Sequence, residues 1–209
     1  MLVVCAHPDD ESFGLGAVIH AFAERGSRVS VLCFTHGEAS TLHGVAGDLA
    51  SVRAAELEAA SRHLAVEQIE LLDYPDGALG AKPSAELAED VRRVALRTAA
   101  TMLLVFDHGG ITGHPDHQAA TQAALVAAAL LDLPVYGWVV PASVAETLNR
   151  ELGTKFVGRE PDPEHNVLSV DRTAQLAAIE CHRSQAIDNP VLRRRLELMG
   201  DHEWLRRLL

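Results

Sequence analysis

The chain has 209 residues, of which 48% are hydrophobic, and a formal net charge of −11 at pH 7. This length is enough for one domain with a substantial buried core, so we expect a single domain over residues 1–209. The acidic balance argues against a nucleic-acid-binding protein, because affinity for phosphate needs clustered Lys and Arg. The C-terminal part of the sequence contains basic residues with acidic ones among them. We expect the basic residues to lie on the solvated face of terminal helices; they are Arg193, Arg194, Arg195, Arg206 and Arg207.

The sequence shows neither a targeting segment nor a disulfide framework. It opens on MLVVCA, a strand-like run without a basic leader or a cleavage site, and no apolar run approaches the roughly 20 residues of a membrane span. The three cysteines are too scattered for paired disulfides, and Cys5 and Cys33 lie inside apolar runs typical of buried thiols. We therefore expect a cytoplasmic protein.

Strand-like apolar runs alternate with helix-length segments over the first two-thirds of the chain. The predicted strands are Leu2–Ala6, Val29–Thr35, Gln68–Asp73, Met102–Asp107 and Val135–Val140. The predicted helices are Phe13–Arg25, Ala50–Leu64, Ser84–Thr98 and Asp116–Leu131. This alternation predicts an α/β fold, with a mostly parallel sheet covered by helices on both faces.

The last third of the chain is less regular at its start, where glycines and prolines interrupt residues 141–171. A strand is expected near Val167–Val170 and a helix near Arg172–His182. Two terminal helices are then predicted over Pro190–Met199 and His202–Leu208.

Polar, chemically active side chains follow the first four predicted strands. They are His7, His36, Glu38, Asp73, Asp76, Asp107, His108 and His114. Open α/β sheets bind their ligands outside the carboxyl ends of the strands, near a topological switch point. The sequence therefore predicts a functional site along this rim.

Two short motifs, AHPDDE at 6–11 and GHPDH at 113–117, carry the side chains of a hydrolytic metal centre. His7 and Asp10 are three residues apart in a turn and can face one point, and His117 would supply a third ligand. Two imidazoles and one carboxylate leave positions open for water and substrate, as in catalytic zinc sites. Two alternatives stay open: the acidic residues of the first motif could merely cap a helix, and His114 could bind the metal in place of His117.

The neighbours of these ligands have the residue types needed for acid–base catalysis. The side chain of Asp9 diverges from that of Asp10, so it would face the attacking water and act as general base. His114 could stabilise an oxyanion and protonate a leaving amine. Asp116 could hold that imidazole in its charged form.

These motifs resemble those of the PIG-L/LmbE superfamily of zinc-dependent N-deacetylases. The strongest matches are AHPDDES at 6–12 and GHPDH at 113–117, and the weaker ones, in the right order, are THGE at 35–38, RAAE at 53–56, DYPDG at 73–77 and HRSQ at 182–185. The resemblance implies a Rossmann-like fold and activity on N-acetylglucosamine conjugates. It also implies the roles of the site residues: zinc ligands His7, Asp10 and His117, general base Asp9, His114 and its partner Asp116 at the intermediate, and substrate contacts Arg53 and Asp76.

The sequence departs from the family at one informative position. Some members have a tyrosine two residues before the first histidine of HPDH, where this chain has Thr112. The phenolic group could come from Tyr74 or Tyr136 instead. Arg53 also has a simpler interpretation, an exposed ion pair with Glu56 on one helix, and Asp76–Gly77 is an ordinary turn pair.

The expected function is therefore a zinc hydrolase that cleaves an acetamide C–N bond of a small N-acetylated amino-sugar conjugate. Fe²⁺ is an alternative cofactor, since two histidines and one carboxylate are also the ligands of non-haem iron oxygenases. A non-catalytic sugar-binding module is the other alternative, because a fold does not dictate a function. A homo-oligomer is compatible with the apolar helices and with family habit.

Overall fold

The computed structural model describes residues 1–44, 47–160, 162 and 165–209. Its centre is a sheet in the order β3-β2-β1-β4-β5-β8-β7, with β6 paired to β5. The strands are β1 Leu2–Cys5, β2 Ser30–Thr35, β3 Gln68–Tyr74, β4 Leu103–Phe106, β5 Val135–Pro141, β6 Gly158–Arg159, β7 His165–Ser169 and β8 His202–Arg207. All pairs from β3 to β5 are parallel, whereas β8 is antiparallel to both β5 and β7.

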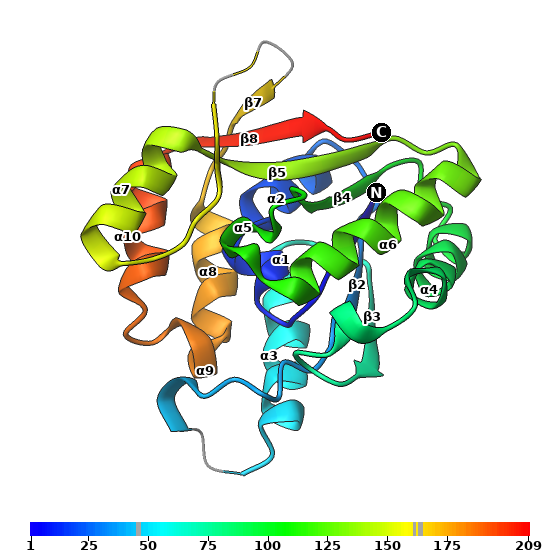
Figure 1. The fold of residues 1–209 in the computed structure, drawn as a ribbon, viewed down its shortest axis with the longest axis horizontal. Helices are drawn as coiled ribbons and strands as arrows, with labels where there is room; N and C mark the ends of the chain where they lie inside the picture. Colours follow the sequence, from blue (N-terminus) through cyan, green and yellow to red (C-terminus); the bar gives the residue numbers. More distant parts are fainter. Residues whose placement is uncertain (45–46, 161, 163–164) are drawn as a thin grey trace.

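Helices cover both faces of this sheet (Figure 1). The α-helices are α1 Asp10–Phe13, α2 Gly16–Glu24, α3 Leu49–His63, α4 Ser84–Arg97, α5 Gly110–Gly113, α6 Pro115–Leu131, α7 Ala142–Leu152, α8 Thr173–Cys181, α9 Arg183–Ala186 and α10 Pro190–Met199. Side chains of α2, α3, α7, α8 and α10 share one hydrophobic cluster, and those of α4 and α6 share another. The single-domain α/β fold predicted from the sequence is confirmed.

The continuous apolar runs of the inner parallel strands follow from burial on both faces. In β1, Val3 and Cys5 join the cluster with α2 and α3, whereas Leu2 and Val4 join the cluster with α4 and α6. All four residues are buried. A strand covered on only one side would instead alternate apolar and polar residues.

The prediction of a helix over His202–Leu208 is wrong, because His202–Arg207 forms strand β8. Its burial alternates: Glu203 and Leu205 are buried, whereas the residues between and around them are partly or fully exposed. That period of two suits a strand between β5 and β7, but the residue types do not show it, because the buried Glu203 is charged and the partly exposed Trp204 is apolar. Residues 141–171, which we expected to be less regular, contain the helix α7.

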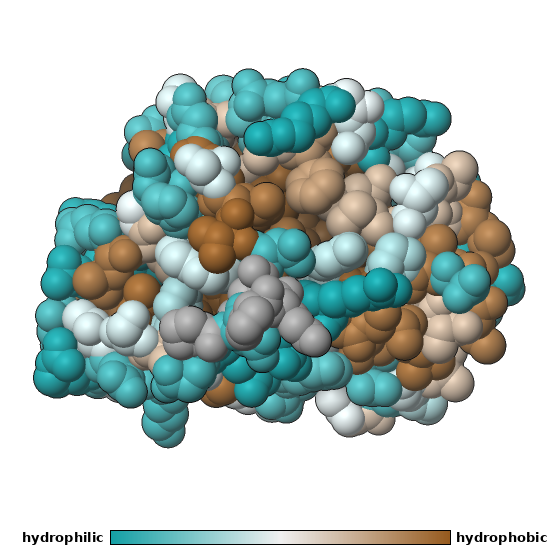
Figure 2. All heavy atoms as spheres, turned by 90° about the horizontal axis from the view of Figure 1, so that it is seen from above, coloured by the Kyte–Doolittle hydropathy of each residue, from teal (hydrophilic) through white to brown (hydrophobic). Residues whose placement is uncertain are grey.

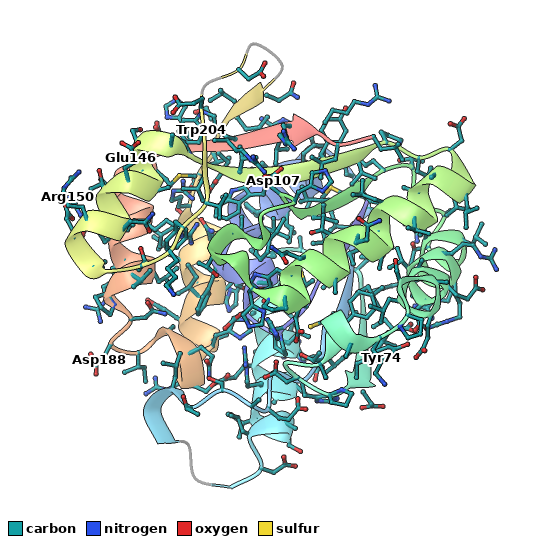
Figure 3. All side chains as sticks on the ribbon, in the orientation of Figure 1. Tyr74, Asp107, Glu146, Arg150, Asp188 and Trp204 are labelled. Atoms are coloured by element: carbon teal, nitrogen blue, oxygen red, sulfur yellow. The ribbon has the colours of Figure 1, made fainter. Side chains whose placement is uncertain are left out.

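The basic residues near the C-terminus are not all solvated, as the sequence had led us to expect. Arg195 on α10 is only 4% exposed. Arg206 on β8 reaches the buried Asp107 after β4, with 2.7 Å between its Nε and a carboxylate oxygen. Figure 3 shows Asp107 in the middle of the molecule. Burial here is decided by the position of each element against the sheet, which the local charge pattern does not encode.

The topology creates a crevice at the carboxyl ends of two strands. β1 lies between β2 and β4, so the chain leaves β1 toward one side of the sheet and later returns on the other. Ligands bind at such a switch point in open α/β sheets. AHPDDE follows β1 and GHPDH follows β4, and the fold therefore brings the two motifs together.

The molecular surface keeps some hydrophobic side chains. Figure 2 shows them in the middle and at one end of the face seen from above, with hydrophilic residues between them. Leu130 on α6 and Val167 on β7 are 71% and 51% exposed. No helix in the described ranges has the length and apolarity needed to cross a membrane. The homo-oligomer stays a prediction.

Candidate metal and catalytic site

A cavity of about 720 Å³ opens at the carboxyl ends of β1 and β4. Most of the residues predicted for the site line it, namely His7, Asp9, Asp10, Arg53, Asp76, His114 and His117. Asp116 is fully buried and lies behind this wall. The cavity is within the size range of small-molecule sites.

The first motif is a turn that fixes the carboxylate of Asp10 and leaves the side chain of Asp9 lining the cavity. One carboxylate oxygen of Asp10 accepts hydrogen bonds from the backbone N–H groups of Ala6 (3.0 Å) and His7 (2.9 Å). Asp9 has a positive φ of 113° and its side chain makes no capping hydrogen bond to α1. Asp9 does occupy the N-cap position of α1, where its carbonyl oxygen accepts from the backbone N–H groups of Ser12 and Phe13, but its carboxylate takes no part in capping. A positive φ at a residue other than glycine is strained, and such strain is typical of functional sites.

Three predicted metal ligands converge on one point. His7 Nδ1 lies 3.2 Å from His117 Nε2, and His117 Nε2 lies 3.1 Å from an oxygen of Asp10. The other oxygen of Asp10 is 3.8 Å from His7 Nδ1. Two imidazole nitrogens and a carboxylate gathered in this way can hold a divalent metal ion.

The outward-facing nitrogens of the two imidazoles are also held. His7 Nε2 lies 3.0 Å from Asp76 and 3.4 Å from Asp116, and His117 Nδ1 lies 3.0 Å from the carbonyl oxygen of Gly110. Metal-binding histidines almost always donate their other N–H to such acceptors. His7, His114 and Asp116 form a second possible group, but it would draw His7 Nε2 away from Asp76. The contacts therefore favour His7, Asp10 and His117.

The electrostatics of this cluster suit a bound cation. Burial opposes the charged form of His7, but hydrogen bonds to Asp116 and Asp76 outweigh it and raise the pKa of His7 to about 10. The pKa of Asp10 is held well below its usual range, because the charge and hydrogen bond of His117 overcome the opposing effect of burial. The carboxylates of Asp10, Asp76 and Asp116 thus lie close together around the two imidazoles. A divalent metal ion would supply the positive charge that stabilises them.

Arg53 and Asp9 form a buried pair beside the metal ligands. The Arg53 guanidinium donates to Asp9 (3.0 Å), to the carbonyl of Pro8 and to the carbonyl of Gly37 (2.6 Å). Burial raises the pKa of Asp9 to about 6, with the charge of Arg53 opposing the rise. The interpretation of Arg53 as an exposed ion pair with Glu56 is therefore wrong.

The glycine of the THGE motif is explained by the same contact. Gly37 has a φ of +64°, and a Cβ atom there would run into the guanidinium of Arg53. Glycine adopts this backbone conformation without a steric penalty. Gly37 therefore provides both the turn and the space that Arg53 needs to reach Asp9.

Asp116 does not hold His114 in the way we expected. The Asp116 carboxylate accepts from the backbone N–H groups of Gly77 (2.7 Å) and Leu79 (3.1 Å) and faces His7. Its backbone N–H donates to Nδ1 of His114 at 3.2 Å, so the ring proton of a neutral His114 is on Nε2. Burial and the neighbouring charge of His117 lower the pKa of His114. The structure thus provides a neutral donor at His114 rather than a charged one.

Neither tyrosine compensates for Thr112. The Tyr74 hydroxyl donates to Asp90 (2.8 Å) on α4, and Figure 3 shows it on β3, to one side of the molecule. Neither Tyr74 nor Tyr136 is among the residues that line the cavity, whereas Thr112 is.

The late HRSQ motif supports the site from behind. His182 Nε2 lies 2.7 Å from Glu11, both side chains being fully buried, and a second Glu11 oxygen accepts from the backbone N–H of Asp9 at 2.9 Å. Ser184 contacts Glu56. The sequence alone suggested only a capping role for Glu11. Its position directly after Asp9 and Asp10 was the signal that could have pointed to its supporting role.

Comparisons with known proteins agree with this geometry. Residues 2–128 match the family described as PIG-L, GlcNAc-PI de-N-acetylase. The chain is 30% identical over 91% of its length to a 1D-myo-inositol 2-acetamido-2-deoxy-alpha-D-glucopyranoside deacetylase from Streptomyces griseus, of which it covers 76%. It is 28% identical over 99% of its length to a probable N-acetyl-alpha-D-glucosaminyl L-malate deacetylase 2 from Bacillus anthracis, of which it covers 92%.

Solved structures show the same fold. A zinc-inhibited form of teicoplanin deacetylase Orf2 superposes with a TM-score of 0.76 at 20% identity, covering 99% of this chain and 97% of that one. GalB, a 4-carboxy-2-hydroxymuconate hydratase from Pseudomonas putida, superposes with a TM-score of 0.77 at 19% identity, covering 100% and 95%. The fold thus serves more than one reaction, and the assignment depends on the sequence match and the site. The family match over residues 2–128 and the similarity to the curated relatives show that the chain belongs to the PIG-L family of deacetylases.

Proposed function

We propose that the protein is a zinc-dependent hydrolase that removes an N-acetyl group from a small N-acetylglucosamine-type conjugate. The observation that carries the proposal is the convergence of His7, Asp10 and His117 beside Asp9 at the base of one cavity. Family membership supports deacetylation, and the curated relatives named above act on N-acetylated glucosaminides.

His7, Asp10 and His117 would hold the metal. Zn²⁺ supplies Lewis acidity that polarises the amide carbonyl and makes water nucleophilic at neutral pH. Fe²⁺ accepts the same ligands, so metal analysis of protein purified without chelator distinguishes the two ions.

Asp9 is the proposed general base. Its carboxylate takes a proton from the attacking water while a C–O bond forms to the acetyl carbon. The C–N bond then breaks, and the proton held by Asp9 passes to the nitrogen, which gives acetate and a free amine. Arg53 keeps the carboxylate in place through its 3.0 Å contact.

His114 is proposed to stabilise the negative charge that develops on the carbonyl oxygen. Because its Nδ1 accepts from the backbone of Asp116, its Nε2–H is the donor that is free to act. A neutral imidazole is sufficient for this role. Arg53 and Asp76 line the cavity and could also contact the sugar, but their contacts to Asp9 and His7 indicate that they position those residues.

The test is amine release from a panel of N-acetylglucosamine conjugates by zinc-loaded protein, with Asp9→Asn as the blank. Asparagine tolerates a positive φ and keeps the shape of the side chain. We expect release by the wild type and a loss of about 10²–10⁴-fold in the variant, with unchanged metal content. Metal-loaded wild type that releases no amine from any conjugate would contradict the proposal.

A further inference from the structure

The cavity extends well beyond the metal ligands, along a wall of aromatic rings. The ring of Phe106 lies 4.9 Å from that of His117 and 5.6 Å from that of Trp138, centroid to centroid. The guanidinium carbon of Arg195 lies 5.1 Å from the centre of the Trp138 ring. All four residues line the cavity, so the wall leads from the metal site to a buried arginine.

Arg195 is a buried cation without a counter-ion in the described part of the chain. It is 4% exposed, and one terminal nitrogen donates to the carbonyl of Phe13. The other terminal nitrogen has no hydrogen-bond partner among the described residues. Glu203 is the carboxylate whose charge acts on Arg195, but it is already engaged by Arg172 at 2.5 Å and by Trp138 Nε1 at 2.6 Å.

This arrangement is costly unless something else binds there. A buried guanidinium normally has an anionic partner, because desolvation of an unpaired charge is unfavourable. Arg53 and Arg172, the comparable arginines of this protein, contact Asp9 and Glu203. Burial lowers the pKa of Arg195 to about 10, despite the opposing charge of Glu203, and the group remains a cation at neutral pH.

The surroundings of Arg195 also indicate what kind of group would bind. Phe156 also lines the cavity, as do Leu192 and the other residues of the first turn of α10, the helix that carries Arg195. The N-terminal end of a helix favours negative charge. An anion attached to an apolar or planar group would therefore suit this end.

We infer that Arg195 binds a carboxylate or phosphate group carried by the part of the substrate distal to the amide. This inference rests on the proposed function for its substrate, but the binding site itself does not. The proposed function places the amide at the metal ligands, and the aromatic wall would accommodate the linking portion. Arg195 would thus select conjugates whose non-sugar portion is anionic.

Binding of small probes tests the site without catalysis. Benzoate and benzamide have the same shape but differ in charge, and their dissociation constants are measured by calorimetry with metal-free protein. We expect benzoate to bind the wild type at least about tenfold more tightly than benzamide. Arg195→Gln should lose this preference, whereas Arg194→Gln, an exposed arginine of the same helix paired with Glu151, should keep it.

Two further arms complete the test. In the first, phenyl phosphate replaces benzoate, and the probe that binds more tightly shows whether Arg195 prefers a phosphate or a carboxylate. If Arg195→Gln does not fold, Arg195→Lys retains the charge without the planar fork and should keep part of the preference. Equal affinity of the wild type for benzoate and benzamide, or an undiminished preference in the Arg195 variant that folds, would overturn the inference.

Activity then separates this inference from the proposed function. The 4-carboxyphenyl and phenyl glycosides of N-acetylglucosamine are compared as substrates, and kcat/KM should favour the carboxyl compound in the wild type but not in Arg195→Gln. Amine release from both with equal kcat/KM would leave the deacetylase standing and overturn the role of Arg195. Release from neither, with benzoate preference intact, would contradict the deacetylase alone.

Discussion

The two ends of the cavity are built on opposite principles. At the metal end, each ring nitrogen of His7 and His117 faces a carboxylate, another imidazole or a carbonyl. Toward Arg195, the cavity is lined by aromatic and aliphatic side chains, and one arginine nitrogen has no hydrogen-bond partner among the residues that the structure describes. The catalytic end is therefore pre-organised by the protein itself, as electrostatic catalysis requires, whereas the far end is completed by a ligand. Substitutions at the two ends should consequently have different effects.

The largest effect is expected from removing a metal ligand. His117→Ala should abolish metal binding and reduce amine release to the level of the Asp9→Asn blank, because two ligands remain. His114→Ala is the matched control and should retain the metal while losing activity. Metal content by mass spectrometry decides between them, and the reverse pattern would make His114 the ligand.

A smaller loss of activity is expected when the side chain of Asp9 is displaced but not removed. Gly37→Ala pushes a methyl group into Arg53 and should lower kcat by about 10–100-fold with full metal occupancy, since small misplacements of catalytic groups are costly. Gly44→Ala is the control, because Gly44 also has a positive φ (+52°) but no atom of the described residues outside its chain neighbours lies within 4 Å of an added Cβ. Equal kcat in both variants would show that Arg53 does not position Asp9.

At the far end, a substitution should change substrate affinity and leave the chemistry intact. Phe156→Ala removes apolar surface from the cavity wall. It should therefore raise KM about tenfold for a conjugate with an aromatic non-sugar portion. The variant should keep its metal and its kcat for the same conjugate. Steady-state kinetics test this, and a fall in kcat with unchanged KM would contradict the division between the two ends.

The smallest effect concerns stability and the brace behind the metal end. Burial opposes charge on His182, but Glu11 raises its pKa above 6.5. The stabilisation is therefore fully present below pH 6.5 and declines as the pH rises through the folded-state pKa. Denaturant unfolding should show that the difference in unfolding free energy between wild type and His182→Asn shrinks above pH 6.5. A difference that grows with pH would exclude a charged His182.

Much of the fold follows from the sequence because its first half is locally consistent. The predicted strands that became β1, β2, β4 and β5 are largely buried on both faces, so their apolar runs are continuous. The edge strand β3 is only partly buried, and its run contains Glu70 and Asp73. The helices between the strands have about the expected lengths. The last strand β8 lacks this signal, since its burial depends on pairing with β5 and β7, which are distant in sequence. Prediction failed where the environment of a segment is supplied by remote strands.

The sequence by itself identified the candidate residues of the proposed metal end. Short-range spacing in AHPDDE and GHPDH is enough to specify candidate ligands and a base, because both motifs follow predicted strands and open α/β sheets bind ligands at the carboxyl ends of their strands. Only the tertiary structure decided how those groups are held: Asp76 behind His7, the Asp116 backbone on His114, and Arg53 against Asp9. It also decided that Arg195 is buried while Arg193 and Arg194 remain at the surface. The physical reason is that a side chain's partners and desolvation depend on what the fold packs against it, and that information is spread over the whole chain.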